Sequence, residues 1–300
     1  MLVLAPALDA SIAAWRRAAP VPTPRTEVAA AAANGEAVVV GGFLADGSTT
    51  GRAEAYSPKT DRWRRLPDLP AAVNHAAGGS WRGRMLVAGG YSGDGVPSSA
   101  AWQLVRGRWT PLPPLPEPRG AAAGVVAGDT FYVVGGVTAT PLGRELAKRA
   151  LALDLSSGRW RTIAGPTPRE HLAATAWRGR VYALGGRLAG YDTNVDRAEV
   201  YDPATRRWGR LSPLREARGG TGAAAIAGRI VSVGGEAPTG TIRRVYAYDL
   251  AARRWRRLAD LPTPRHGLGV VALGGRVRVL AGGPTPGLTV SGANESLAVP

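Results

Sequence analysis

The sequence predicts an all-β fold, a six-bladed β-propeller with four antiparallel strands per blade. Three observations lead to this prediction. Gly-Gly pairs recur six times between Gly41-Gly42 and Gly282-Gly283, at intervals of 46 to 50 residues. Six tryptophans, from Trp15 to Trp255, recur with nearly the same period. The chain also contains 41 glycines and 24 prolines, which separate short apolar runs by frequent turns. Self-similarity at one fixed period is typical of repeat architectures.

Each repeat unit divides into four short strands. The first consists of small apolar residues, as in residues 120–126, and ends in a turn pair such as Asn34-Gly35 that suits a two-residue hairpin. The second strand runs into the diglycine. The third carries a large residue seven positions before the tryptophan of the fourth strand: Tyr56, Trp102, Leu153, Tyr201 and Tyr248. Asp154, Asp202 and Asp249 follow directly, and we expect their side chains to bond backbone N–H groups of the next turn.

The ends of the chain predict how the ring closes. No diglycine precedes Trp15, and no tryptophan follows Gly282-Gly283, so the N-terminal strand is expected to complete the sixth blade. Two segments fit the third strand of that blade, residues 295–300 and residues 3–8. We expect the C-terminal segment there, with Trp15 on the fourth strand. The chain then forms a single propeller over residues 1–300, with blades at about 25–66, 72–112, 119–163, 169–211, 218–258 and 265–300 plus 1–18.

The composition limits the possible functions. Cysteine is absent, which excludes disulfides, thiolate metal sites and cysteine nucleophiles. Lysine and arginine number 38 against 22 acidic residues, a formal net charge of +16 that would attract anions. The arginines flank the repeat tryptophans instead of forming one block. We therefore do not expect nucleic-acid binding, which would rest on net charge alone.

No apolar run approaches the length needed to span a membrane, so no membrane association is expected. The N-terminus lacks the basic region of a signal peptide, and Leu8, Asp9 and Trp15 fit the repeat, so this segment is expected to be part of the fold. We expect a soluble monomer, and the compartment stays open because cysteine-free proteins occur both inside and outside cells. In the absence of a clear signal peptide, the cytoplasm is slightly favoured.

An arginine series marks a candidate ligand site. Arginine stands sixteen residues before the diglycine in four units, and seventeen before it in the last, whereas the second unit has Val73. These positions precede the innermost strands, whose entries converge at one mouth of a propeller channel. Period-two geometry would place Arg25 and Glu27 on one side of their strand. The predicted ligand-binding residues are Arg25, His75, Arg119, Arg169, His171, Arg218, Arg265 and His266.

With their diglycine, spaced tyrosine and tryptophan, often with Asp after the tyrosine, these units resemble kelch repeats over nearly the whole chain. The resemblance implies a propeller but not one function, because kelch propellers include interaction modules, oxidases, sugar mutarotases and lyase-like specifiers. The copper oxidases need a cysteine, which this chain lacks. The three histidines lie in separate units without metal-ligand spacing, so no metal and no cofactor are expected.

Two functions remain open. The favoured one is a binding module for a protein or an acidic ligand at the arginine-lined channel mouth, where arginines bind carboxylates bidentately. The alternative is a carbohydrate-active enzyme that resembles the sialic-acid mutarotases and acts on an acidic sugar. In that case Glu27 or Glu170 would transfer the proton, and neighbouring arginines would hold the sugar carboxylate. A closed pocket with Glu27 or Glu170 beside two or more arginines would favour the enzyme, and a broad open mouth would favour binding.

Overall fold

Turn chemistry and strand alternation build each blade. In the computed structural model, which describes residues 14–141 and 143–300, both residues of Asn34-Gly35 have positive φ, 50° and 77°. Arg82-Gly83, Arg178-Gly179 and Gly274-Gly275 have the same geometry. These are the φ values of a type I′ hairpin, whose twist matches that of the flanking strands. In the turn from the third to the fourth strand, Asp154 Oδ1 accepts the backbone N–H groups of Ser156 and Ser157, as predicted.

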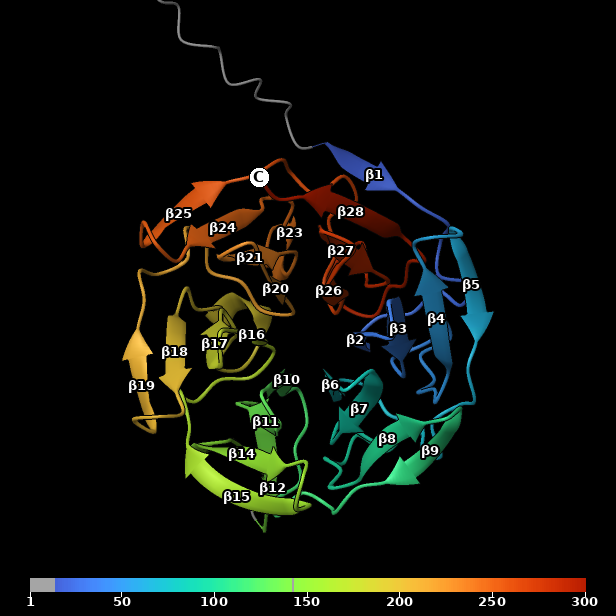
Figure 1. Ribbon diagram of the computed structural model, residues 1–300, viewed down its shortest axis with the longest axis vertical. Helices are drawn as coiled ribbons and strands as arrows, with labels where there is room; N and C mark the ends of the chain where they lie inside the picture. The colour runs from blue at the N-terminus through green and yellow to red at the C-terminus, as the bar shows by residue number, and fades with distance from the viewer. Residues whose placement is uncertain (1–13, 142) are drawn as a thin grey trace, which may run out of the picture.

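The blades follow one another in chain order around a ring (Figure 1). The first three blades are β2 (Ala29–Ala33), β3 (Glu36–Val40), β4 (Ala53–Ser57) and β5 (Arg62–Arg65); β6 (Ala77–Trp81), β7 (Arg84–Ala88), β8 (Ala101–Val105) and β9 (Arg108–Pro111); and β10 (Ala123–Ala127), β11 (Thr130–Val134), β14 (Arg149–Asp154) and β15 (Arg159–Ala164). The next two are β16 (Ala173–Trp177), β17 (Arg180–Leu184), β18 (Ala198–Asp202) and β19 (Arg207–Arg210); and β20 (Gly222–Ile226), β21 (Arg229–Val233), β24 (Tyr246–Asp249) and β25 (Arg254–Arg257).

The sixth blade joins the two ends of the described chain. Its strands are β26 (Gly269–Leu273), β27 (Arg276–Leu280), β28 (Asn294–Ala298) and β1 (Trp15–Arg17). β1 pairs antiparallel with β28, with Trp15 opposite Leu297, and Figure 1 shows the first strand beside the last. The predicted closure is confirmed, with the C-terminal segment as third strand and Trp15 on the fourth. The competing segment 3–8, with Leu8 and Asp9, lies outside the described residues.

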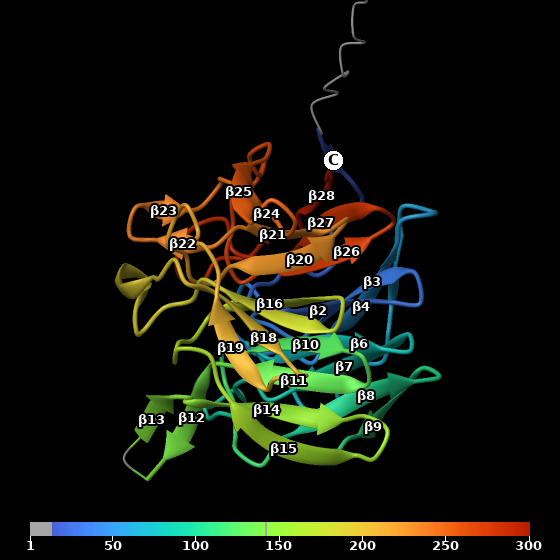
Figure 2. The same cartoon turned by 60° about the vertical axis from the view of Figure 1, so that its left-hand side comes forward.

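The loops between second and third strands project from one face of the ring (Figure 2). Two of them form small hairpins, β12 (Val137–Thr140) with β13 (Gly143–Leu146), and β22 (Glu236–Ala237) with β23 (Gly240–Thr241). A third contains the short 3-10 helix η1 (Tyr191–Thr193). The connectors that lead into the first strands reach the same face. We call this end of the channel the loop mouth.

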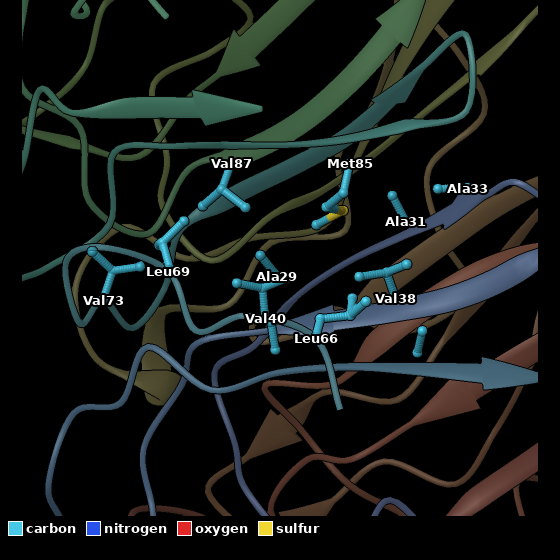
Figure 3. Packing of buried hydrophobic residues seen from close by; sticks show 12 residues of the cluster. Ala29, Ala31, Ala33, Val38, Val40, Leu66, Leu69, Val73, Met85 and Val87 are labelled. Carbon is cyan, nitrogen blue, oxygen red and sulfur yellow. The ribbon is translucent and has the colours of Figure 1, made fainter. Parts of the chain in front are cut away.

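The hydrophobic core lies between blades. One cluster joins each neighbouring pair of blades, and Figure 3 shows that of the first two, where Val38 and Val40 of β3 lie near Met85 and Val87 of β7. At the centre, the six first strands line a channel of about 340 Å³ with small residues such as Ala31, Gly79 and Ala224. A Cβ on Gly79 would lie 2.9 Å from Phe131, because neighbouring strands approach closely here. Among the described residues, no helix is long and apolar enough to cross a membrane.

The diglycine needs its special backbone. Gly42 has φ of 105°, and a Cβ there would lie 2.4 Å from the carbonyl oxygen of Thr26. In the sixth blade, the two diglycine positions are occupied by Ala281 and Gly282, and not by Gly282 and Gly283 as the sequence suggests. Ala281 has φ of 56°, and Gly282 N–H donates to the carbonyl of Arg25 as Gly42 N–H donates to that of Val73. Counted to Ala281, the spacing from Arg265 is sixteen residues, as in the other blades.

Six tryptophans link each blade to the preceding one. The indole N–H of each donates to a backbone carbonyl at or just after the end of the fourth strand of that preceding blade. The donor–acceptor pairs are Trp15–Ala259, Trp63–Ala19, Trp109–Pro67, Trp160–Pro113, Trp208–Ala164 and Trp255–Ser212, at 2.8 to 2.9 Å. The period of the tryptophans thus reflects one repeated contact between blades.

We expect Trp208→Phe to lower the free energy of unfolding by about 1 kcal/mol, because the ring keeps its packing but loses one hydrogen bond. Urea unfolding would measure this. Trp81→Phe is the matched control, since its indole also bonds a neighbouring blade, but through the side chain of Asp129 and not through a backbone carbonyl, and should cost less. An equal loss in both variants would contradict a special role for the bond to the backbone carbonyl.

Candidate functional site at the loop mouth

One residue from each blade forms a ring at the loop mouth. These residues lie two positions after the connector arginine or its equivalent, and all six have left-handed φ between 51° and 61°: Glu27, His75, Ala121, His171, Gly220 and Gly267. Their backbones are joined by hydrogen bonds, in which the N–H groups of all but Glu27 donate to the carbonyl of the corresponding residue in the preceding blade. The N–H of Val28 bonds Gly267 and closes the circle. We call this arrangement the backbone ring.

The backbone ring determines where side chains point. Glu27, His75 and His171 line a cavity of about 90 Å³ together with the small residues of the other blades. The predicted extended geometry, with Arg25 and Glu27 on one side of a strand, is not found because Glu27 adopts φ of 54°. Glu27 faces the cavity, whereas the Arg25 side chain is fully buried. Non-glycine residues in this backbone region are uncommon and cluster at functional sites.

The predicted arginine ring does not line the mouth. Arg25, Arg119, Arg169, Arg218 and Arg265 are at most 1% exposed and bind groups of their own blades. Arg265, for example, donates to the carbonyls of Thr263, Val279 and Ala281 and to Glu295 Oε2 at 2.6 Å. This placement speaks against direct contact with a ligand. It gives the arginines a structural role, which is to fix each connector to its blade.

The partners of these arginines follow a rule. Where Thr stands two residues before the arginine, a buried glutamate on the third strand pairs with it, in Arg25–Glu54, Arg169–Glu199 and Arg265–Glu295. Where Glu117 or Glu216 stands there, that residue pairs with the arginine instead. In the second blade, Val73 replaces the arginine and Trp102 takes the register position of the glutamate, opposite Val87. Both members of the pair therefore change together: a blade has either two charged residues that pair or, as in the second blade, two apolar residues.

The register of the second blade differs from that of the others. Trp102, seven residues before Trp109, does not lie opposite it. Leu104 pairs with Trp109, because the Arg106-Gly107 turn is shorter than the equivalent turns in other blades. In four other blades the residue seven positions before the tryptophan lies opposite it, at Tyr56, Leu153, Tyr201 and Tyr248.

A charged network occupies one side of the mouth. Arg187 Nε donates to Glu170 Oε1 at 3.1 Å, Nη1 to Glu236 Oε1 at 2.7 Å, and Nη2 contacts His171 Nε2 at 2.9 Å. Because burial raises the pKa of a carboxyl group, Glu170 needs these partners. His171 and Arg187 outweigh the burial and hold the pKa of Glu170 below its usual range. Glu170 is therefore a charged member of an ion-pair network.

Glu27 connects two histidines of other blades. Its Oε2 lies 3.2 Å from His75 Nε2, and its Oε1 lies 3.1 Å from His266 Nδ1. The other nitrogen of His266 faces the carbonyl oxygens of Thr285 and Gly287 at 3.1 and 3.0 Å. Since both ring nitrogens face acceptors, His266 is a double donor, the imidazolium form.

The pKa shifts agree with this geometry. Burial opposes the charge on His266, but the hydrogen bond to Glu27 and the charges of Glu27 and Glu236 raise its pKa. Burial would raise the pKa of Glu27, yet His75, His266 and His171 lower it. For His75 the burial dominates and lowers the pKa to about 4 despite Glu27. At neutral pH the mouth therefore holds an ionised Glu27 beside a neutral His75.

Aromatic rings cover the other side of His75. Phe43 and Tyr91 contact its ring edge to face, with centroids 5.8 and 5.5 Å apart. Arg144 of β13 lies over Tyr91, at 5.4 Å from the ring centroid. Burial raises the pKa of Tyr91 to about 12, so this hydroxyl stays neutral. His75 is thus held between an apolar wall and a carboxylate.

The rim of the loop mouth is apolar at several points. Four large hydrophobic side chains are exposed among the described residues, by 44 to 52%: Val96, Leu188, Tyr191 and Leu288. All four lie in loops between second and third strands, in the second, fourth and sixth blades. Exposed apolar groups collected on one face mark contact surfaces more often than scattered ones do.

The geometry offers little support for the mutarotase-like alternative. Glu27 has no arginine partner, and Glu170 has one, Arg187, where two or more were expected beside the acid. Small-molecule pockets usually enclose about 300–1,000 Å³. The cavity beside Glu27 encloses about 90 Å³, which is the space of roughly three water molecules.

The sequence predicted most of the residues that meet at the loop mouth, but not the contacts that they make with one another. Glu27, His75, Glu170, His171 and His266 converge, although the five predicted arginines do not join them. Three contributors lie outside the predicted set: Arg187, Glu236 and Asn74. Glu236 follows the diglycine directly, as Arg187 does, and residues in that position pair with the residue after the connector arginine. That repeat position was the available signal.

Comparisons with known proteins assign the family. Residues 74–283 match the KLHDC2/KLHL20/DRC7 Kelch-repeats domain, and residues 24–70 match the Kelch motif. Kelch-like protein terF of Aspergillus terreus is 32% identical over 49% of this chain and 34% of its own length. Kelch-like protein 7 of Gallus gallus is 28% identical over 46% of this chain and 31% of its own length. The alignments thus span about a third of these curated relatives. With a family match over most of its length and six blades, the chain belongs to the kelch-repeat family.

Proposed function

We propose that this propeller is a protein-interaction module that binds its partner at the loop mouth. The observation that carries the proposal is the apolar rim, because all exposed large hydrophobic side chains of the described residues lie in the loops of this face. Apolar and aromatic anchors around a polar centre are the usual composition of a protein-binding patch. A kelch propeller typically serves this role, which supports the assignment.

The charge of the chain favours an acidic partner. A formal net charge of +16 attracts acidic surfaces over distances of about a Debye length. The contact is therefore expected to weaken as salt concentration rises. The five buried arginines are not part of the proposed surface, because their guanidinium groups are already bonded within the blades.

Rim substitutions test the proposal. Leu188→Ser with Tyr191→Ser removes two anchors, and we expect at least a tenfold loss of affinity, since each anchor contributes more than about 1 kcal/mol. The measurement is quantitative affinity capture from cell extract, followed by titration of the purified partner. Arg62→Ser, an exposed change on the outer strand β5, is the control and should retain the same proteins. Equal retention by the rim variant and the control would contradict the proposal.

A further inference from the structure

We propose that Glu27, His75 and His171 form a binding site for a divalent transition-metal ion at the axis of the propeller. One donor atom of each residue lies within 4.8 Å of the other two. The three residues come from the first, second and fourth blades and meet only because the backbone ring brings them together. This inference goes beyond protein binding and does not depend on it.

His75 turns one ring nitrogen toward Glu27. Its Nδ1 lies 2.6 Å from Asn74 Oδ1, and Asn74 Nδ2 lies 2.9 Å from Thr49 Oγ1. When Nδ1–H donates to Asn74, Nε2 presents its lone pair toward Glu27 Oε2 at 3.2 Å, and a metal ion between these two atoms would satisfy both. In a tetrahedral site with bonds of about 2.1 Å, ligand atoms lie about 3.4 Å apart, so the observed spacing fits a metal ion.

Further groups lie behind the proposed donor atoms. Metal-binding histidines usually donate their other ring N–H to a fixed acceptor, and metal-binding carboxylates are themselves hydrogen-bonded. His75 has Asn74 in this role, and Glu27 Oε1 has His266. The Nδ1 of His171 is buried without a hydrogen-bond partner, 3.3 Å from Glu170 Oε1. Its Nε2 lies 2.9 Å from Arg187 Nη2, a group that can only donate, so this nitrogen would bind the ion in place of Arg187.

The net charge of the cluster and the cavity beside it also favour a bound cation. Three carboxylates in the cluster, on Glu27, Glu170 and Glu236, outnumber the two cationic groups, Arg187 and His266. The excess negative charge favours a cation. The adjoining cavity of about 90 Å³ has room for roughly three waters, which would complete the coordination.

The donor set indicates the kind of metal. Two imidazoles with one carboxylate suit zinc, iron, cobalt or nickel, whereas magnesium and calcium prefer oxygen ligands. Three protein ligands beside a water-sized cavity make an open site, in contrast to structural zinc sites, which are closed by four protein ligands. The site is therefore accessible from the loop mouth.

The test uses the full-length chain without a histidine tag, dialysed against chelator and titrated with Zn²⁺ by calorimetry. We expect one Zn²⁺ per chain and a higher thermal midpoint with the ion bound. His75→Ala and Glu27→Gln should each weaken binding at least a hundredfold, and Asn74→Ala, which affects only the orientation of His75, by 10- to 100-fold. Co²⁺ provides a spectroscopic check, because its visible absorption reports nitrogen coordination. Glu145→Gln, an exposed carboxylate on β13, is the control and should bind normally.

The chain itself indicates that His75→Ala can fold. Alanine and glycine occupy the same position of the backbone ring in three other blades, at Ala121, Gly220 and Gly267. Circular dichroism would verify folding, and Glu27→Gln keeps the side-chain shape if the alanine variant fails. Absence of stoichiometric binding in the wild type would overturn the proposal and leave a proton between Glu27 and His75. Unchanged affinity in both ligand variants would also overturn it. Neither result would affect the rim experiment, which measures partner binding.

Discussion

Arg169→Ala is expected to lower the free energy of unfolding by about 3–5 kcal/mol, although Arg169 contacts no solvent and no proposed ligand. The variant would leave Glu199 buried, with one Oε bonded to Thr167 and the other without its cation. The carbonyls of Ala183 and Gly185 would also lose their donors. Urea unfolding would measure the loss. Arg207→Ala, an exposed arginine on β19 of the same blade, should change stability by less than about 0.5 kcal/mol.

A double substitution separates the ion pair from the position itself. The second blade contains Val73 and Trp102 where the fourth contains Arg169 and Glu199. Combining Arg169→Val with Glu199→Trp should therefore destabilise less than Arg169→Val alone, because no buried charge remains unpaired. If the double variant were less stable than Arg169→Val alone, the idea that an apolar pair can replace the charged pair at these two positions would be wrong.

A chain that begins at residue 19 is expected to melt about 5 °C or more below the full chain. It lacks β1, so β28 loses its outer neighbour and becomes an exposed edge. It also lacks Trp15, which packs on the core between the fifth and sixth blades and bonds Ala259. Losing a packed tryptophan costs about 3 kcal/mol, and each kcal/mol lowers the midpoint by about 2 °C in a chain of this size.

Differential scanning calorimetry would measure the midpoint. Trp15→Ala should reproduce most of the loss, and Arg16→Ala, on the exposed side of the same strand, should have little effect. An unchanged midpoint in the truncated chain would show that β1 does not stabilise the closure.

The repeat was predictable because it depends on short-range chemistry. The diglycine, the turn pairs and the tryptophans each satisfy a local backbone need, so residue type and spacing indicate them directly. The sixth blade shows the limit of this reasoning. Gly283 suggested a diglycine at Gly282-Gly283, but the hydrogen bonds use Ala281 and Gly282, because left-handed φ tolerates alanine there.

The candidate site was less predictable because it depends on contacts between blades. A buried arginine and a ligand-binding arginine look alike in the sequence, and for Arg169 and Arg265 the distinguishing partner, Glu199 or Glu295, stands thirty residues later. His75 and His171 are nearly a hundred residues apart, yet their ring centroids lie 4.8 Å apart. The shared repeat position marks which residues meet at the axis, but the spacing does not show which of their side chains contact one another.

The backbone ring also makes this propeller a favourable scaffold for engineering. Six equivalent positions meet at one axis, and their fixed geometry comes from main-chain hydrogen bonds that do not depend on side-chain identity. The chain already accommodates glutamate, histidine, alanine and glycine among them. Asparagine, aspartate and histidine tolerate the required left-handed conformation best among non-glycine residues. A small combinatorial library at these six positions could therefore generate new ligand or metal sites without redesign of the fold.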